Sequence, residues 1–371
     1  MKASKAHWYT VRNIASVDSP ALLVYPDRVL KNIRHALKMM PDKTCLRPHI
    51  KTNKMAEVCT MMLKEGITKF KCATIAEAEM LARVNAPDVL LAYQPVGPKA
   101  ERFLELIDKY PQTRFSCLVD DEQVAAYLSK LAVASKKKVA VWIDLNVGMN
   151  RTGIVPEKVP VLIDSCHALE GIEVEGFHAY DGHNNAPDLA ARKKEGDAVF
   201  ERVHALVLST EQQFGKTLRI LLGGSPSFPA HLNRKNVECS PGTFVFWDAG
   251  YQSKYPEQPF DIAALVVTRV ISIVDRHTIC TDLGHKSVAA ENPLPRVHFL
   301  NHPSATPVGQ SEEHLLLGVN DASAYKIGDV LYGVPVHICP TVALYERAIV
   351  VEQKEAGKEW KVIARDRKIS V

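Results

Sequence analysis

The stretch Leu46–Lys54, with the sequence LRPHIKTNK, combines an apolar run with a lysine at its end. Pro48 biases the residue before it toward an extended backbone. The run from Cys45 to Ile50 therefore predicts a short buried strand, and the residues after Lys54 predict a helix. Lys51 is expected where a strand ends and a helix is about to begin, which is the active-site face of an α/β barrel.

A lysine at that position has a chemical use that an ordinary surface lysine lacks. Burial at a barrel mouth lowers the pKa of the amine, and the neutral amine of Lys51 could then form an imine with a carbonyl compound. The alternative for the stretch taken alone is a solvated lysine at a strand end. The remaining motifs of the chain decide between the two.

Strand-like and helix-like stretches alternate through the first two thirds of the chain. The strands are apolar on both faces and are separated by helices, which indicates parallel pairing. Eight such runs from Cys45 onward, after a first strand at Pro20–Tyr25, predict a (β/α)8 TIM-type barrel. The predicted strands are Pro20–Tyr25, Cys45–Ile50, Phe70–Ala73, Val89–Tyr93, Arg114–Val119, Val139–Val147, Val174–Tyr180, Arg219–Leu222 and Phe244–Trp247. The predicted helices are Asp27–Met40, Met55–Glu65, Ile75–Val84, Pro98–Tyr110, Glu122–Ser135, Val159–Ala168 and Ala190–Phe214.

The pattern changes near Trp247, after which short β runs replace the helical periodicity. A second, mostly antiparallel β domain is therefore expected at the C-terminal end. The predicted division is an N-terminal leader over 1–18, a barrel over 19–250 and a β domain over 251–371, with Gln252–Phe260 as the linker. The β runs are Ala264–Val274, Thr278–Thr281, Arg296–Phe299, Glu313–Val319, Val330–Gly333, Val342–Gln353 and Trp360–Val371.

Composition excludes several classes of function for this 371-residue chain. A charged fraction of 24%, a net charge of +4 and no basic run longer than Lys136–Lys138 give no support for nucleic-acid binding. No apolar stretch is long enough to span a membrane, and no secretion signal is expected. The eight cysteines are scattered without a CxxC pair, which favours a reducing cytoplasm.

Two kinds of loop offer anion-binding groups. In the stretch Asp144–Gly153, two glycines bracket Arg151, so the backbone can turn tightly and aim the guanidinium over the barrel mouth. The stretches Leu221–Ser227 and Ser240–Thr243 end predicted inter-strand segments with glycines and hydroxyls, which suit a phosphate. Late barrel loops are the usual phosphate position. The alternatives are a surface ion pair for Arg151 and ordinary turns for the other two.

Two further pairs of residues are candidates for chemistry. Tyr180 and His183 follow a predicted strand and are expected to point into the barrel mouth, although a lone histidine is more often structural. His337 and Cys339 lie two residues apart in the predicted β domain, and if this stretch is a strand both side chains share one face. Such a pair can bind a zinc ion and leave two positions open. Buried packing is the commoner explanation for His-x-Cys.

These residues together resemble the D-threonine aldolase and D-serine dehydratase family, within the alanine-racemase-like fold of pyridoxal-phosphate (PLP) enzymes. The resemblance covers nearly the whole chain. The stretches that carry it, in order, are Ser19–Val24, Arg47–Lys51, Met149–Gly153, His178–Gly182, Gly284–Ser287, Ser311–His314 and His337–Val342.

The resemblance implies a role for each candidate residue. Lys51 would bind PLP covalently, and no other lysine is expected at a strand end that faces the phosphate loops. Arg151 would bond the phenolic oxygen of the cofactor, with Tyr180 beside it. His337 and Cys339 would hold a divalent metal, zinc first and manganese second, and the chain would form a homodimer. The phosphate would be held by Gly224, Ser225, Gly242 and Thr243.

Two departures bear on the reaction. Ser240 stands where alanine racemases carry an arginine facing the pyridine nitrogen, which favours a lyase over a racemase. Cys339 stands where aldolases more often carry aspartate, whereas dehydratases carry cysteine. The stretch Pro340–Tyr345 nevertheless looks more like the aldolases.

The predicted function is a PLP- and metal-dependent lyase that acts on a small D-β-hydroxy amino acid. The first choice is a D-threonine aldolase type, in which the metal polarises the β-hydroxyl and His183 removes its proton. The alternative is a D-serine or D-threo-3-hydroxyaspartate dehydratase, in which Lys51 removes the α-proton. Two non-enzymatic readings are a PLP carrier protein and a metal-free binding module.

Overall fold

A computed structural model describes residues 7–371, and these residues divide into two compact units. The barrel unit consists of Arg34–Lys51, Cys59–Gly242 and Asp366–Val371. The β unit consists of the described part of Met1–Ile33, with Thr52–Val58 and Thr243–Arg365. No helix within 7–371 has both the length and the apolar character needed to cross a membrane.

The barrel unit is built on a seven-stranded sheet in which every neighbouring pair is parallel and the strands follow one another in sequence order. Buried apolar residues fill the strands, as the double-sided apolar pattern predicts. The strands are β2 (Lys69–Cys72), β3 (Asp88–Leu91), β4 (Arg114–Val119), β5 (Val139–Asp144), β6 (Ile172–His178), β7 (Arg219–Leu222) and β8 (Val237–Cys239).

The segment around Pro48 joins the two ends of this sheet. Leu46 bridges in parallel to Cys239 of β8, and His49 bridges in parallel to Lys71 of β2. The Arg47 N–H donates to the Cys239 carbonyl at 2.9 Å, and the Ile50 N–H donates to the Lys71 carbonyl at 2.9 Å. The predicted (β/α)8 barrel class is therefore confirmed, with this segment as the eighth member of the ring.

The last predicted barrel strand is wrong, and one strand was missed. Residues 244–247 were expected as a strand, but Thr243–Val245 form the 3₁₀ helix η4, and the phenyl ring of Phe244 packs against Phe260 in the β unit. The final strand is β8, whose three residues include Glu238. A three-residue run with a central carboxylate has no apolar periodicity, so the sequence pattern could not identify it.

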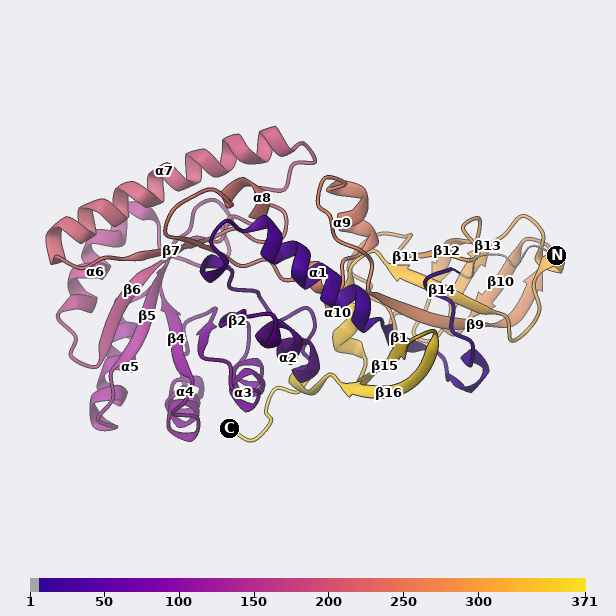
Figure 1. Ribbon diagram of the computed structural model, residues 1–371, viewed down its shortest axis with the longest axis horizontal. Coiled ribbons are helices and arrows are strands. Elements are labelled where there is room, and N and C mark those ends of the chain that lie inside the picture. The colour runs from indigo at the N-terminus through magenta and orange to yellow at the C-terminus, as the bar shows by residue number, and fades with distance from the viewer. Residues whose placement is uncertain (1–6) are drawn as a thin grey trace. The chain divides into compact units, whose positions relative to one another are not determined.

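The helices of the barrel unit follow the strands as predicted, and Figure 1 shows α4, α5 and α6 along the outer side of the sheet. Aspartate or threonine side chains cap three of them at their N-termini: Thr74, Asp121 and Asp188. The helices are α2 (Ala56–Lys64), α3 (Ile75–Arg83), α4 (Pro98–Lys109), α5 (Glu122–Ala134), α6 (Val159–His167), α7 (Leu189–Phe214) and α8 (Phe228–His231), with α1 (Pro26–Met39) before them and 3₁₀ turns at Lys43–Cys45 (η2) and Pro156–Lys158 (η3). Helices α1 and α2 each contain a boundary between the two units.

The segment Leu46–Ile50, which closes the ring of strands and is called the closing segment below, is held in the barrel by a buried ion network. The fully buried Arg47 donates to Glu238 at 2.5 Å and to Asp88 at 2.6 Å, and its guanidinium lies 5.6 Å from the ring centroid of Trp142. Burial opposes the charge on Arg47, but the two carboxylates outweigh it and raise its pKa. Asp88 is the first residue of β3, so this network lies toward the amino ends of the strands.

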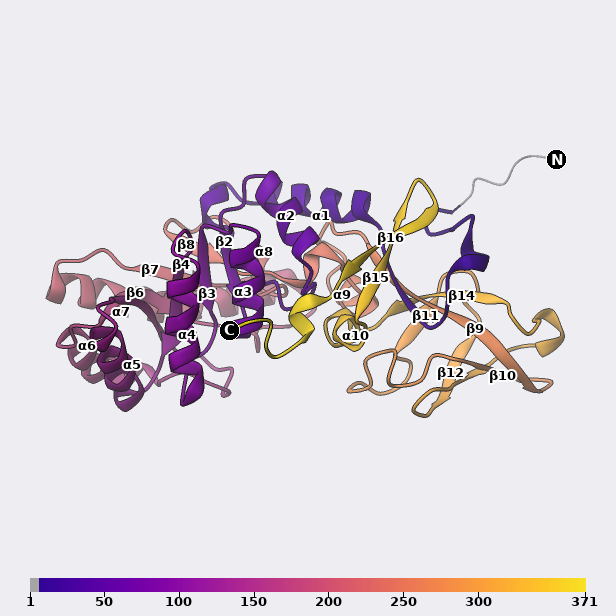
Figure 2. The ribbon, with the colours of Figure 1, turned by 90° about the horizontal axis from the view of Figure 1, so that it is seen from below.

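The β unit contains a nine-stranded, largely antiparallel sheet, as predicted for the C-terminal part of the chain. Figure 2 shows the long strand β9 beside its hairpin partner β10. The strands are β1 (Ala21–Val24), β9 (Ala264–Asp275), β10 (Thr278–Thr281), β11 (Val297–Phe299), β12 (Thr306–Gln310), β13 (Leu315–Gly318), β14 (Val330–Pro335), β15 (Arg347–Glu352) and β16 (Glu355–Lys361). The short helices are η1 (Ile14–Ser16), η4, α9 (Ala249–Lys254), η5 (Ala322–Ala324), α10 (Ile338–Leu344) and η6 (Ile363–Arg365).

The predicted boundaries at 18/19 and 250/251 differ from this division. Strand β1 was expected to open the barrel, but it pairs antiparallel with β9 and parallel with β15 in the β unit. Its four residues are all buried, and an isolated buried strand carries no information about which sheet it joins. The N-terminal segment thus belongs with the C-terminal part of the chain.

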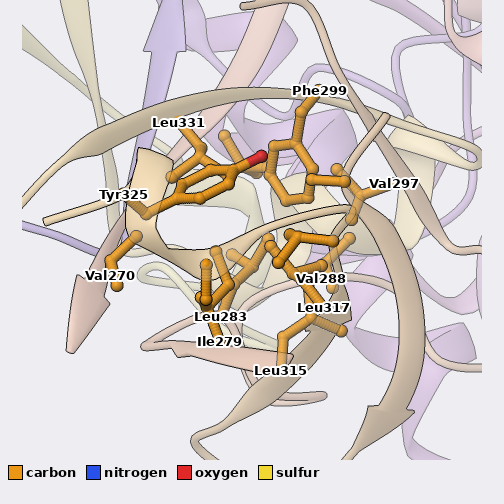
Figure 3. Packing of buried hydrophobic residues seen from close by; sticks show 14 residues of the cluster. Val270, Ile279, Leu283, Val288, Val297, Phe299, Leu315, Leu317, Tyr325 and Leu331 are labelled. Atoms are coloured by element: carbon orange, nitrogen blue, oxygen red, sulfur yellow. The ribbon is translucent and has the colours of Figure 1, made fainter. Parts of the chain in front are cut away.

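The core of the β unit is a cluster of aliphatic side chains contributed by several strands (Figure 3). Val270, Ile279 and Leu317 come from β9, β10 and β13, and they meet Phe299 from β11. Each of these four side chains is at most 3% exposed. These residues come from the short β runs that, with the loss of helical periodicity, predicted a β domain from the sequence.

Candidate active site

A cavity of about 250 Å³ lies at the carboxyl ends of the barrel strands. This is the face at which α/β barrels carry their active sites. Two lysines, an arginine and two histidines line it, and among the described residues no carboxylate does. The lining residues are His49, Lys51, Lys71, Ala73, Ala92, Tyr93, Arg151, Thr152, His178 and Tyr180.

Lys51 lies in this cavity directly after the closing segment. Its backbone N–H donates to His49 Nδ1 at 3.3 Å, and its side chain is partly buried. The predicted position of Lys51 at the mouth of the barrel is therefore observed. The preceding residues 45–50 do not form the predicted continuous strand, because only Leu46 and His49 make isolated bridges to β8 and β2. Two further sequence candidates, Arg151 and Tyr180, also line this cavity.

A second lysine, Lys71, shares the cavity and was not expected. It belongs to β2, and its Nζ lies 2.7 Å from His178 Nε2 and 3.1 Å from Ser240 Oγ. His178 Nδ1 in turn lies 2.6 Å from Asp144 Oδ1. The expectation that only Lys51 would face the phosphate loops is wrong, because the strand register turns Lys71 inward.

The charges of these groups determine which atom donates in each hydrogen bond between Asp144, His178 and Lys71. Burial raises the pKa of Asp144, but His178 and Thr152 outweigh burial and hold the carboxyl below its usual pKa. A carboxylate can only accept, so His178 donates from Nδ1 and accepts at Nε2 from Lys71. Burial, followed by the nearby Lys51 charge, lowers the pKa of Lys71 to about 7.

The loop that carries Arg151 has the backbone that its glycines predict. Gly148 and Gly153 both have positive φ, and a side chain at Gly153 would lie 2.6 Å from the backbone of Leu145 and Asn146. The Gly153 N–H donates to Asp120 at 2.8 Å. Arg151 lines the cavity with its guanidinium carbon 5.1 Å from the ring centroid of Tyr180.

The two predicted phosphate loops lie together in the barrel unit. The Gly242 N–H donates to Ser225 Oγ at 3.1 Å, and the Gly224 N–H donates to Ser227 Oγ at 3.2 Å. Ser227 Oγ in turn donates to the buried Asp181 at 2.7 Å. A Cβ at Gly224 would lie 2.8 Å from the Tyr180 ring, so only glycine permits this close approach.

Thr243 and His183 are placed differently from these residues. Thr243 belongs to the β unit, where its hydroxyl lies 3.5 Å from Cys339 Sγ. His183 does not line the Lys51 cavity. It lies against Gly148, with its Nε2 3.6 Å from Glu195, and its buried Nδ1 has no hydrogen-bond partner within 7–371.

The expectation that His337 and Cys339 share one face of a strand is wrong. His337 is the N-cap of helix α10, and Cys339 lies in its first turn. The Ile338 N–H donates to the buried Asp248 at 3.1 Å, which satisfies a donor of the first turn. Thr341 is also helical, and its hydroxyl donates to the His337 carbonyl at 2.8 Å. The predicted β run 342–353 is therefore divided in the structure, with its first residues in α10 and most of the rest in β15.

His337 and Cys339 are nevertheless brought together at the start of α10. Their side chains hydrogen bond to each other, and Cys339 Sγ lies 3.0 Å from Thr52 Oγ1. His337 Nδ1 also contacts a carboxylate oxygen of Glu291. Burial raises the pKa of the Cys339 thiol, but the interactions with His337 and Thr52 outweigh it and lower that pKa.

This donor set fits a soft divalent metal. The interactions with Cys339 and Glu291 raise the pKa of His337 to about 9 against the effect of burial, so without a metal the two side chains form a thiolate–imidazolium pair. Cysteine and histidine are typical zinc ligands. No third His, Cys, Asp or Glu joins them as a metal ligand within the part of the chain that the structure describes. A metal here would therefore keep open positions.

The side chains that the sequence analysis missed share one property. Lys71, His178 and Asp144 each lie on a strand that reads as apolar, and each is buried. A charged residue inside a buried parallel strand, as in Phe70-Lys71-Cys72, is the signal that could have identified Lys71. Glu291 had no such signal, because it reaches His337 from a loop that is distant in the sequence.

Comparison with known proteins agrees with this architecture. Residues 24–249 match the family model described as "Alanine racemase, N-terminal domain", and residues 263–351 match the model described as "Putative serine dehydratase domain". A D-threonine aldolase from Arthrobacter sp. is 25% identical over 363 residues, which cover 95% of this chain and 94% of the relative.

Two further proteins show the same similarity. A D-threo-3-hydroxyaspartate dehydratase from Delftia sp. (strain HT23) is 22% identical, over 90% of this chain and 93% of the relative. The crystal structure of D-threonine aldolase from Filomicrobium marinum superposes with a TM-score of 0.86 at 24% identity, over 95% of this chain and 96% of that one. By the match over 24–249, this chain belongs to the alanine racemase N-terminal domain family.

Proposed function

We propose that this protein is a PLP- and metal-dependent lyase that cleaves a small D-β-hydroxy amino acid by an aldolase reaction. The observation that carries the proposal is the cavity in which Lys51, Arg151 and Tyr180 lie together at the carboxyl ends of the strands. The relatives at 22–25% identity over more than nine tenths of their length are aldolases and dehydratases, which supports the lyase class.

The residues of the barrel unit fit PLP in chemistry and charge. A phosphate and a phenolate suit a cavity that Lys51, Lys71 and Arg151 line and that no carboxylate within 7–371 lines. We propose that Lys51 provides the covalent attachment and that the loops of Gly224, Ser225 and Gly242 bind the phosphate, joined by Thr243. Bound PLP would supply an electron sink for the carbanion that forms when the Cα–Cβ bond breaks.

In the β unit, His337 and Cys339 would hold the divalent metal, which would polarise the β-hydroxyl of the substrate. We propose zinc as the first choice and manganese as the second, because a thiolate–imidazole pair favours the softer ion. His183 is the proposed base that removes the hydroxyl proton. A homodimer and a cytoplasmic location are further proposals.

A D-β-hydroxy acid dehydratase is the second candidate function, and Cys339 is the observation that favours it. Product identification separates the two. The aldolase converts D-threonine to glycine and acetaldehyde, whereas the dehydratase converts D-threonine or D-serine to an oxo acid and ammonia. Formation of an oxo acid alone would exclude the aldolase, and no turnover with a bound cofactor would favour a PLP carrier.

Attachment at Lys51 is tested by borohydride reduction of the PLP-loaded protein followed by peptide mapping. The label should lie on Lys51, and Lys51→Ala should remove both the label and the turnover. Lys54→Ala is the matched control, because Lys54 lies three residues further along and does not line the cavity. A label that persists in Lys51→Ala would contradict the assignment.

A further inference from the structure

Lys71 is buried close to other cationic side chains, which is an unusual environment for a lysine with a purely structural role. It is 3% exposed, and the cations Lys51 and Arg151 line the same cavity. The carboxylates nearest to it are set back from the cavity, since Asp144 lies behind His178 and Asp181 bonds Ser227 and His231. A buried cation that faces two other cations is costly unless a ligand compensates for it.

The hydrogen bonds of Lys71 show which part of its nitrogen is available. An ammonium has three donor positions, and two are directed at His178 Nε2 and Ser240 Oγ. The third position carries either a proton or a lone pair and belongs to a side chain that lines the cavity. The nitrogen can thus change protonation while both hydrogen bonds are kept.

We propose that Lys71 is a second functional lysine of the cofactor cavity, which takes up a proton when an anionic cofactor binds and then provides positive charge beside it. This inference rests on the proposed function, because it assumes that PLP binds where Lys51 and Arg151 lie. It assigns to Lys71 a role distinct from covalent attachment, which belongs to Lys51.

Electrostatics gives the direction of the proton movement. With its pKa near 7, Lys71 is mostly neutral at pH 8 before the cofactor binds. The phosphate and phenolate bring negative charge close to the buried amine of Lys71, so they favour its charged form. Cofactor binding at pH 8 should therefore add roughly 0.5–0.9 proton at Lys71.

Other titratable or charged groups face Lys71 from the neighbouring elements. The closing segment offers His49 and Lys51, the loop after β5 offers Arg151, and β6 offers His178. The pKa of His178 is lowered by burial and by Lys71, so His178 is neutral at this pH. Replacement of Lys71 alone isolates its contribution from those of His49, Lys51 and the cofactor.

The test measures protons bound per PLP by titration calorimetry at pH 8 in two buffers of different ionisation enthalpy. Wild-type apoprotein should take up roughly 0.5–0.9 proton more than Lys71→Met. Lys71→Arg keeps the charge but cannot release it, so it should bind PLP and lack the extra uptake. Lys69→Gln, on the same strand but bonded to Glu238, should behave as wild type.

Separate readouts distinguish the possible failures. Far-ultraviolet circular dichroism establishes that each variant is folded, and borohydride mapping shows whether the label lies on Lys51. If the label is on Lys51 and proton uptake in both Lys71 variants equals that of wild type, this inference fails and the proposed function stands. If wild type binds no PLP, both fail. A label on Lys71 would also overturn the non-covalent role proposed for that residue.

Discussion

At the scale of single residues, the charged side chains that line the Lys51 cavity contact residues from several parts of the barrel. Arg151 lies over the Tyr180 ring and is carried on a loop with two positive-φ glycines. Replacing it by alanine should leave an oxygen of the bound cofactor unpaired, which costs about 1–3 kcal/mol, or roughly 5- to 150-fold in PLP affinity. Arg151→Lys should be nearly as harmful if the contact needs a planar fork.

PLP affinity of the two variants is measured by equilibrium titration of the apoprotein. Arg202→Lys serves as the matched control, because Arg202 is another arginine of the barrel unit that does not line the cavity. If PLP affinity is unchanged in both Arg151 variants, Arg151 does not bind the cofactor and is a turn residue that makes a surface ion pair.

Lys71 should also make the stability of the apoprotein depend on pH. Its folded-state pKa of about 7 lies below its ordinary value of 10.5, so between these values the unfolded chain binds more protons than the folded one. The free energy of unfolding should therefore rise with pH over this interval, by at most about 1.4 kcal/mol per pH unit from this group. Urea unfolding at pH 7 to 9 should show a smaller rise in Lys71→Met than in wild type, and equal slopes would contradict the assignment.

At the scale of elements, the closing segment Leu46–Ile50 completes the ring of strands through few backbone contacts and the Arg47 network. Arg47→Ala would leave Glu238 and Asp88 buried with less compensation. We expect a loss of about 3–5 kcal/mol in the free energy of unfolding. Arg34→Ala is the control, because the Arg34–Glu65 ion pair lies at the surface, where solvent screens it, and its loss should have a much smaller effect. Urea unfolding of both variants measures the difference.

A second prediction at this scale concerns metal binding at helix α10, whose first turn places Cys339 beside its N-cap His337. Cys339→Asp keeps a ligand but makes it harder, so metal preference should shift toward manganese and activity should be partly lost. Cys339→Ala should remove metal and turnover together. Elemental analysis of purified protein measures the metal, with Cys45→Ala as the free-cysteine control. Full metal content in Cys339→Ala would indicate packing alone.

At the scale of the whole molecule, the two units divide the proposed chemistry. Lys51 and the loops of Gly224 and Gly242 belong to the barrel unit, whereas His337 and Cys339 belong to the β unit. A chelator should therefore abolish turnover while the PLP absorbance and the Lys51 label persist. Zinc or manganese should restore the rate. An active protein that contains no metal and keeps its rate with a chelator would remove the support for the metal-dependent mechanism.

The amino-acid sequence by itself determined the barrel class, the C-terminal β region, and the positions of Lys51 and Arg151 relative to strand ends. These depend on local periodicity and on glycines beside polar residues, and both are visible along the chain. The pairing of Ala21–Val24 with β9 and β15 depends on contacts more than 200 residues away. No local pattern contains that information.

Only the tertiary structure decided which buried polar residues meet. Lys71, His178 and Asp144 lie on three separate strands, and only the register of the closed barrel brings their nitrogens and oxygens within hydrogen-bond distance. His337 and Cys339 meet on a helix start and not on a strand, because Asp248 supplies the acceptor that begins α10. Periodicity predicts elements, whereas long-range packing determines which side chains they bring together.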